Sequence, residues 1–150
     1  MIPFKTQYNK LVNAYLKDQV NPYNGCACFV GNLLNNSMGW VTNKYRKASL
    51  HLVISEEDSN SAIYCISRQS DNTYTEKDIF DLEYKFMSIC NNKNSLECAK
   101  NGSSWQALSK EVQENRLFKA FEETLLLLKQ IHESKGEVIE DYTFKKRELV

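Results

Sequence analysis

The chain has 150 residues, of which 42% are apolar and 25% are charged, a composition typical of globular proteins. This length is sufficient to bury a core, so we expect one globular domain over residues 1–150. The 19 basic and 19 acidic side chains cancel to a net charge of +0, which argues against broad electrostatic capture of nucleic acid.

The first third of the chain predicts two helices. Residues 4–18 carry apolar side chains at helical spacing and read as an amphipathic helix. The pair Asn21-Pro22 is expected to end this helix, and a second helix is expected over 25–36, with Asn24 as its N-cap. Beyond it, two short apolar runs within residues 50–66 are compatible with a small β-hairpin or with short buried helical turns.

The second half of the chain has the clearest helical patterns. Thr75 and Asp78 resemble a capping box at the start of a helix over 76–90. After a polar connection, residues 104–134 form the strongest helical signal, and Gly136 is suited to terminate it.

Two features of this last segment stay open. Its apolar face changes sides near Asn115, so either two helices meet there or one long helix contacts different layers of the core. The residues that follow, 137–150, are expected to be a C-terminal extension that is either loosely packed or docked. Together the elements predict a mainly α-helical fold, a compact bundle of about four to six helices, with a small β-hairpin near 50–66 as an option.

The stretch NGCACFVGN contains the two strongest candidates for a reactive side chain, Cys26 and Cys28. On the predicted helix, Cys26 lies on the apolar stripe and is expected in the core, as free cysteines commonly are. Cys28 points to the polar side of the same helix. Because the first turn of a helix stabilises a thiolate, Cys28 is the better-placed candidate nucleophile and Cys26 the second.

A cysteine hydrolase also needs a histidine that moves protons, and His51 lies in a short apolar run further along the chain. A cysteine at a helix start followed by a later histidine on a strand resembles papain-like and NlpC/P60-like peptidases, over about 30 residues of this chain. The resemblance implies a peptidase or amidase in which Cys28 or Cys26 attacks the substrate and His51 is the base.

Two other ionisable residues lie on apolar faces. His132 follows Leu128 at helical spacing, which indicates a hydrogen-bonded histidine at the edge of the core. Glu83 lies between Ile79 and Phe86, where a carboxylate is unusual. We expect a rim position or a buried basic partner for Glu83, because a role as general acid would require a pocket and a raised pKa.

The five cysteines are odd in number and irregularly spaced, which indicates reduced thiols. Their spacing does not match a zinc site, and we predict neither a metal nor another cofactor. The N-terminus lacks the pattern of a secretory signal, and no apolar run approaches the ~20 residues of a membrane helix. A cytoplasmic protein without a membrane partner is therefore expected.

The absence of strong catalytic motifs favours a protein-binding or assembly module, with a protein partner or a second copy of the chain as its ligand. The alternative is the Cys–His hydrolase built on Cys28, Cys26 and His51. Whether the protein is an enzyme stays open on the sequence, with the non-enzyme interpretation favoured.

Overall fold

A computed structural model describes residues 2–22, 28–35, 73–91 and 105–148. Within these residues the chain forms the helices α1 (Phe4–Leu16), α2 (Phe29–Leu33), α4 (Glu76–Asn91) and α6 (Lys110–Ser134). The prediction of a mainly α-helical fold is confirmed. The hairpin considered near 50–66 lies outside the described residues.

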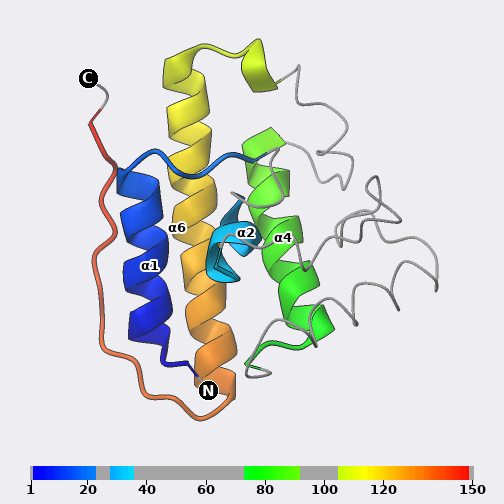
Figure 1. Ribbon diagram of the computed structural model, residues 1–150, viewed down its shortest axis with the longest axis vertical. Helices are drawn as coiled ribbons and strands as arrows, with labels where there is room; N and C mark the ends of the chain where they lie inside the picture. The colour runs from blue at the N-terminus through cyan, green and yellow to red at the C-terminus, as the bar shows by residue number, and fades with distance from the viewer. Residues whose placement is uncertain (1, 23–27, 36–72, 92–104, 149–150) are drawn as a thin grey trace, which may run out of the picture.

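The three long helices lie side by side, with α6 between α1 and α4 (Figure 1). In the same view α1 and α4 run in one direction and α6 runs in the other. The short helix α2 packs against both α1 and α4. This arrangement surrounds the apolar stripe of α6 on two sides, as expected for a helical bundle.

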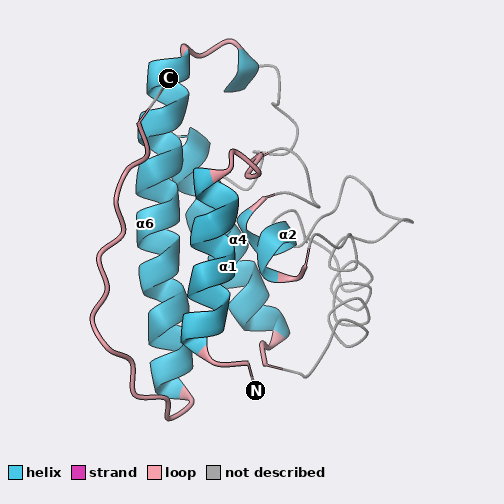
Figure 2. Cartoon of the chain, turned by 60° about the vertical axis from the view of Figure 1, so that its left-hand side comes forward, coloured by secondary structure: helices cyan, strands magenta, loops and turns pink. Residues whose placement is uncertain are grey.

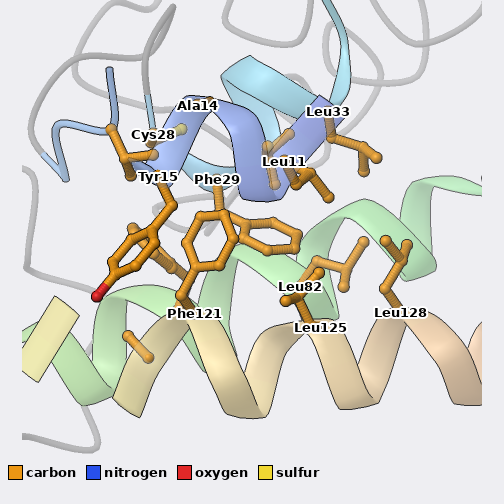
Figure 3. Packing of buried hydrophobic residues seen from close by; sticks show 14 of the residues in the cluster. Leu11, Ala14, Tyr15, Cys28, Phe29, Leu33, Leu82, Phe121, Leu125 and Leu128 are labelled. Carbon is orange, nitrogen blue, oxygen red and sulfur yellow. The ribbon is translucent and has the colours of Figure 1, made fainter. Parts of the chain in front are cut away.

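The centre of the core is an aromatic cluster that joins all four helices (Figure 3). Phe29 of α2 meets Phe121 of α6 edge-on, with ring centroids 5.1 Å apart, and lies 5.8 Å from the ring of Phe86 in α4. Tyr15 of α1 lies 5.3 Å from Phe121 on another side. These distances are those of favourable aromatic pairs, so the short helix α2 is anchored by its first residue.

Local signals in the sequence explain where the helices begin and end. The predicted capping box is present, since the amide of Thr75 donates to Asp78 Oδ2 at 2.9 Å and the amide of Asp78 donates to Thr75 Oγ1 at 3.1 Å. Helix α6 begins after Ser109, whose hydroxyl accepts from the amide of Val112. As predicted, Gly136 follows the end of α6, and its φ of +96° is a conformation that glycine adopts readily.

The change of apolar face near Asn115 is resolved in favour of one long helix. Helix α6 is continuous from Lys110 to Ser134, and Ser109 marks its start. The first apolar residues of the predicted 104–134 helix therefore precede α6, and Trp105 is buried there in a separate short turn.

The C-terminal segment, defined as residues 137–148, is docked rather than loose. It has no regular secondary structure and runs back along α1 and α6 (Figures 1 and 2). Phe144 is buried within it. The sequence left open whether this part of the chain is loosely packed or docked. The contacts of Phe144 and Arg147 with α6 are those of a docked segment.

Candidate functional site

Cys28 lies at the start of α2, but its side chain points into the protein. It is the N-cap residue, with extended backbone angles, and its Sγ accepts a hydrogen bond from the amide of Gly31 at 3.3 Å. Only 1% of Cys28 is exposed. The prediction that Cys28 occupies the polar side of a helix over 25–36 is therefore wrong. A residue ahead of the helix does not follow the helical spacing on which that prediction rested.

Glu83 of α4 is the partner that the structure brings to Cys28. Cys28 Sγ lies 3.7 Å from Glu83 Oε2, and Glu83 is also 1% exposed. Beside them Asn32 is buried, and its Nδ2 donates to the carbonyl oxygens of Cys28 and Gln19. Glu83 thus occupies the apolar face on which the sequence places it, and it is buried rather than at the rim.

Burial determines the protonation of this pair. Removal from water raises the pKa of Glu83 to about 8, although the hydrogen bond from Cys28 partly opposes the shift. Burial, and then the charge of Glu83 when it is ionised, raises the pKa of the Cys28 thiol well above its ordinary value of 9.0. Both groups are therefore neutral at pH 7.

A neutral thiol beside a neutral carboxyl group is the opposite of an activated nucleophile. Cysteine nucleophiles have a lowered pKa and contact solvent, whereas Cys28 is enclosed. The other two candidates, Cys26 and His51, lie outside the described residues. Of the three predicted site residues, the structure therefore places only Cys28, next to Glu83.

His132 is the centre of a second buried polar group. It is 0% exposed, its Nε2 lies 2.7 Å from the hydroxyl of Tyr74, and its Nδ1 lies 3.0 Å from Glu137 Oε1. Glu137 also accepts from the amide of Phe4, at 2.9 Å to Oε2. As predicted, the histidine is hydrogen-bonded, but it is fully buried rather than at the edge of the core. The group connects the start of α1 to the end of α6.

The C-terminal segment is held by two aromatic side chains. Phe144 stacks on Phe118 and Phe121 of α6, with centroids 5.3 and 5.4 Å away, and lies 5.0 Å from Tyr15 of α1. Tyr142 lies 4.7 Å from the ring of Tyr8. Phe144 is buried by these contacts, whereas Tyr8 and Tyr142 are half-buried, so Phe144 is the stronger of the two anchors.

Arg147 is the polar anchor of the same segment. Its Nε and Nη2 bind the two carboxylate oxygens of Glu114 at 3.1 and 2.8 Å, and its Nη1 donates to the carbonyl oxygen of Tyr15 at 2.6 Å. The guanidinium also lies 4.9 Å from the centre of the Tyr15 ring. Two parallel hydrogen bonds to one carboxylate are the strongest form of this contact.

Glu114 itself is 3% exposed and accepts a hydrogen bond of 2.7 Å from the hydroxyl of Tyr15. Burial, followed by that bond, holds the pKa of Tyr15 above its usual value, so the phenol stays a donor. Removing one partner of such a buried charged pair typically costs about 3–5 kcal/mol, because the other charge remains uncompensated. Glu114 therefore requires a cation at this position.

We call the residues of α1 and α6 that hold the C-terminal segment the segment-binding face: Phe4, Tyr8, Tyr15, Glu114, Phe118 and Phe121. Reasoning from the sequence alone did not identify this face. One signal was present, since Glu114 precedes Leu117 and Phe121 at helical spacing, on the apolar stripe of α6. Its partner Arg147 lies in a segment without periodicity.

Within the described parts of the chain, no group of three or more His, Cys, Asp or Glu side chains is placed to hold a metal ion. None of the described helices has the length and apolar character needed to span a membrane. Comparison of the chain with protein-family models, with curated proteins and with solved structures gave no match.

Proposed function

We propose that this protein is a protein-binding module and that its binding surface is the segment-binding face of α1 and α6. The observation that carries the proposal is the contact between Arg147 and the buried Glu114. A face that holds an irregular segment through aromatic and arginine side chains has the features of a peptide-recognition surface. In this structure the C-terminal segment occupies it.

The type of contact supports recognition of a separate chain. Phe144 and Arg147 reach the face with their side chains, and the helices α1 and α6 do not depend on the backbone of the segment for their own hydrogen bonds. Tyrosine, phenylalanine and arginine are also the residue types enriched in the centres of protein interfaces. The same contacts can therefore form when the segment belongs to another molecule.

The competing hypothesis, a hydrolase with Cys28 as nucleophile, gains no support from the described residues. The burial of Cys28 and the raised pKa of its thiol oppose a thiolate at neutral pH. We therefore place the function on the segment-binding face.

The test uses the full chain with a weakened segment, the variant Phe144→Ala/Arg147→Ala, and a fluorescent peptide that carries residues 141–150. We expect saturable binding by fluorescence anisotropy and a rise in the melting temperature of the variant, since the peptide binds only the folded chain. A peptide with Arg147→Ala is the matched control, and its affinity should be at least about tenfold lower.

The proposal fails if the variant is folded by circular dichroism and the peptide shows no saturable binding at millimolar concentration. It also fails if the native and Arg147→Ala peptides bind equally well. Should the double alanine variant not fold, the milder Phe144→Leu/Arg147→Lys chain takes its place, because lysine loses the two-pronged contact while keeping the charge.

A further inference from the structure

We infer that the partner of the segment-binding face is a second copy of this chain, and that two copies exchange their C-terminal segments. Each segment then fills the face of the other molecule with the contacts that it makes within one molecule here. This inference rests on the proposed function and names its ligand.

Charge complementarity at a buried position favours a second copy as the partner. Glu114 is enclosed beneath the segment, and Arg147 supplies the matching cation. A ligand for this face must bring an arginine to Glu114 and an aromatic ring to Phe118 and Phe121. In the C-terminal segment of this chain, Phe144 provides the ring and Arg147 the arginine, three positions further along the sequence. A second copy carries the same spacing by construction.

The segment also has a place to bend. Glu137 is fixed, because its carboxylate binds His132 and the amide of Phe4. Immediately after it, Val138 is 96% exposed and Glu140 is exposed, whereas Ile139 packs partly against the core and the exposed Asp141 lies 3.8 Å from Lys129 Nζ. A change of backbone direction here costs the partial packing of Ile139 and one exposed ion pair, which contributes little, so residues 138–141 can act as the hinge.

The exchanged dimer and the closed monomer make nearly the same contacts, so the exchange costs little. An exchanged dimer keeps the contacts of Phe144 and Arg147 and alters only the hinge. Closure within one molecule is favoured by the high effective concentration of a tethered segment. The dimer is therefore expected at high protein concentration, and any change that hinders closure within one molecule should shift the equilibrium towards it.

The first experiment shortens the hinge by deleting Glu140 and Asp141 from the full chain. Two residues span about 7 Å of extended backbone, so the shortened segment no longer reaches its own face in register. We expect light scattering with size-exclusion chromatography to show a dimer. A chain lengthened by Gly-Ser at the same place is the matched control and should be a monomer. Adding Arg147→Ala to the shortened chain should abolish the dimer.

The second experiment keeps the native hinge and identifies the interface. One chain carries Glu114→Gln, which weakens its face, and the other carries Arg147→Ala, which weakens its segment. Mixed together, they can form one intact contact, between the segment of the first and the face of the second. The mixture should therefore form more dimer than either variant alone at the same total concentration.

The inference is overturned if the folded shortened chain stays monomeric at millimolar concentration, or if mixing the two variants produces no additional dimer. If the shortened chain does not fold, the mixing experiment decides alone. A chain that binds the peptide of residues 141–150 but never dimerises would leave the proposed function standing and would assign the face to a segment of a different protein. A chain that fails to bind this peptide would remove the proposed function itself.

Discussion

Glu83 is the residue whose physical state differs most from that of a typical side chain of its kind. It lies within the bundle beside the Cys28 thiol, and burial raises its pKa to about 8. A carboxylic acid in this position can accept a hydrogen bond without carrying a charge in an apolar environment. We therefore regard the Cys28–Glu83 pair as part of the core.

The raised pKa of Glu83 makes stability depend on pH. In the unfolded chain this carboxyl group ionises near the ordinary glutamate pKa of 4.5, and in the folded chain its pKa is about 8. Between these values the folded state holds one more proton than the unfolded state. Stability contributed by Glu83 is therefore full below pH 4.5, falls as pH rises by up to about 1.4 kcal/mol per unit, and levels off above pH 8.

The substitution Glu83→Gln tests this state directly. Glutamine has nearly the same shape and stays neutral, so the unfolding free energy of the variant should exceed that of the native chain by less than about 1 kcal/mol at pH 5 and by roughly 4 kcal/mol at pH 8. Urea unfolding at both pH values measures the difference. Glu122→Gln, at an exposed position of α6, is the control and should not change the pH profile. An equal difference at both pH values would mean that Glu83 is ionised in the folded protein.

The sequence predicted the helix near Cys28 but not the direction of the Cys28 side chain. The helical pattern in this stretch was recognisable, but the helix begins at Phe29 and Cys28 is its cap. Boundaries of short helices depend on which residue caps them, and a shift of that boundary reversed the predicted direction of the thiol. Glu83 was identifiable from its apolar neighbours, whereas its proximity to Cys28 depends on how α2 packs on α4 and is not encoded in local spacing.

At the scale of elements, the C-terminal segment contributes to stability as a helix would. It carries Phe144 into contact with three aromatic rings and Arg147 into contact with Glu114. Its ends are fixed near the two ends of α1, because Glu137 binds the amide of Phe4 and Arg147 binds the carbonyl oxygen of Tyr15. The segment therefore acts as a strap along α1.

Removing the Phe144 ring should reveal this contribution. We expect Phe144→Ala to lower the unfolding free energy by about 3 kcal/mol, at the lower end of the range for buried phenylalanine because the site is near the surface. Val138→Ala, in the exposed part of the same segment, should change it by less than about 0.5 kcal/mol. Thermal or urea unfolding measures both. Equal effects of the two substitutions would show that the segment is not docked in solution.

The helices were predictable because their signals are local. Apolar spacing placed α1, α4 and most of α6, and the capping box at Thr75 and the glycine at Gly136 marked two of their ends correctly. The C-terminal segment has no such signal, because an irregular strap is specified by what it packs against. Only the lone carboxylate of Glu114 on the stripe of α6 indicated that something charged covers that face.

For the whole molecule, the described helices form one core, and two of the three buried polar clusters described above join the ends of helices to the C-terminal part of the chain. The cluster around His132 joins the start of α1 to the end of α6, and the cluster around Glu114 joins α1, α6 and the C-terminal segment. Both clusters are formed by residues far apart in the sequence. The proposed function belongs to the cluster around Glu114, since its cation Arg147 comes from the C-terminal segment.

Recognition of the segment is tested most directly by the energetic coupling between Glu114 and Arg147 when the two belong to different molecules. Two chains are prepared, both with Phe144→Ala/Arg147→Ala, and one of them also carries Glu114→Gln. Each chain is titrated with two peptides of residues 141–150, one with the native Arg147 and one with Arg147→Gln. We predict a coupling energy of about 1.5–3 kcal/mol in this double-mutant cycle. Additive losses, with a coupling near zero, would contradict recognition of Arg147 by the segment-binding face.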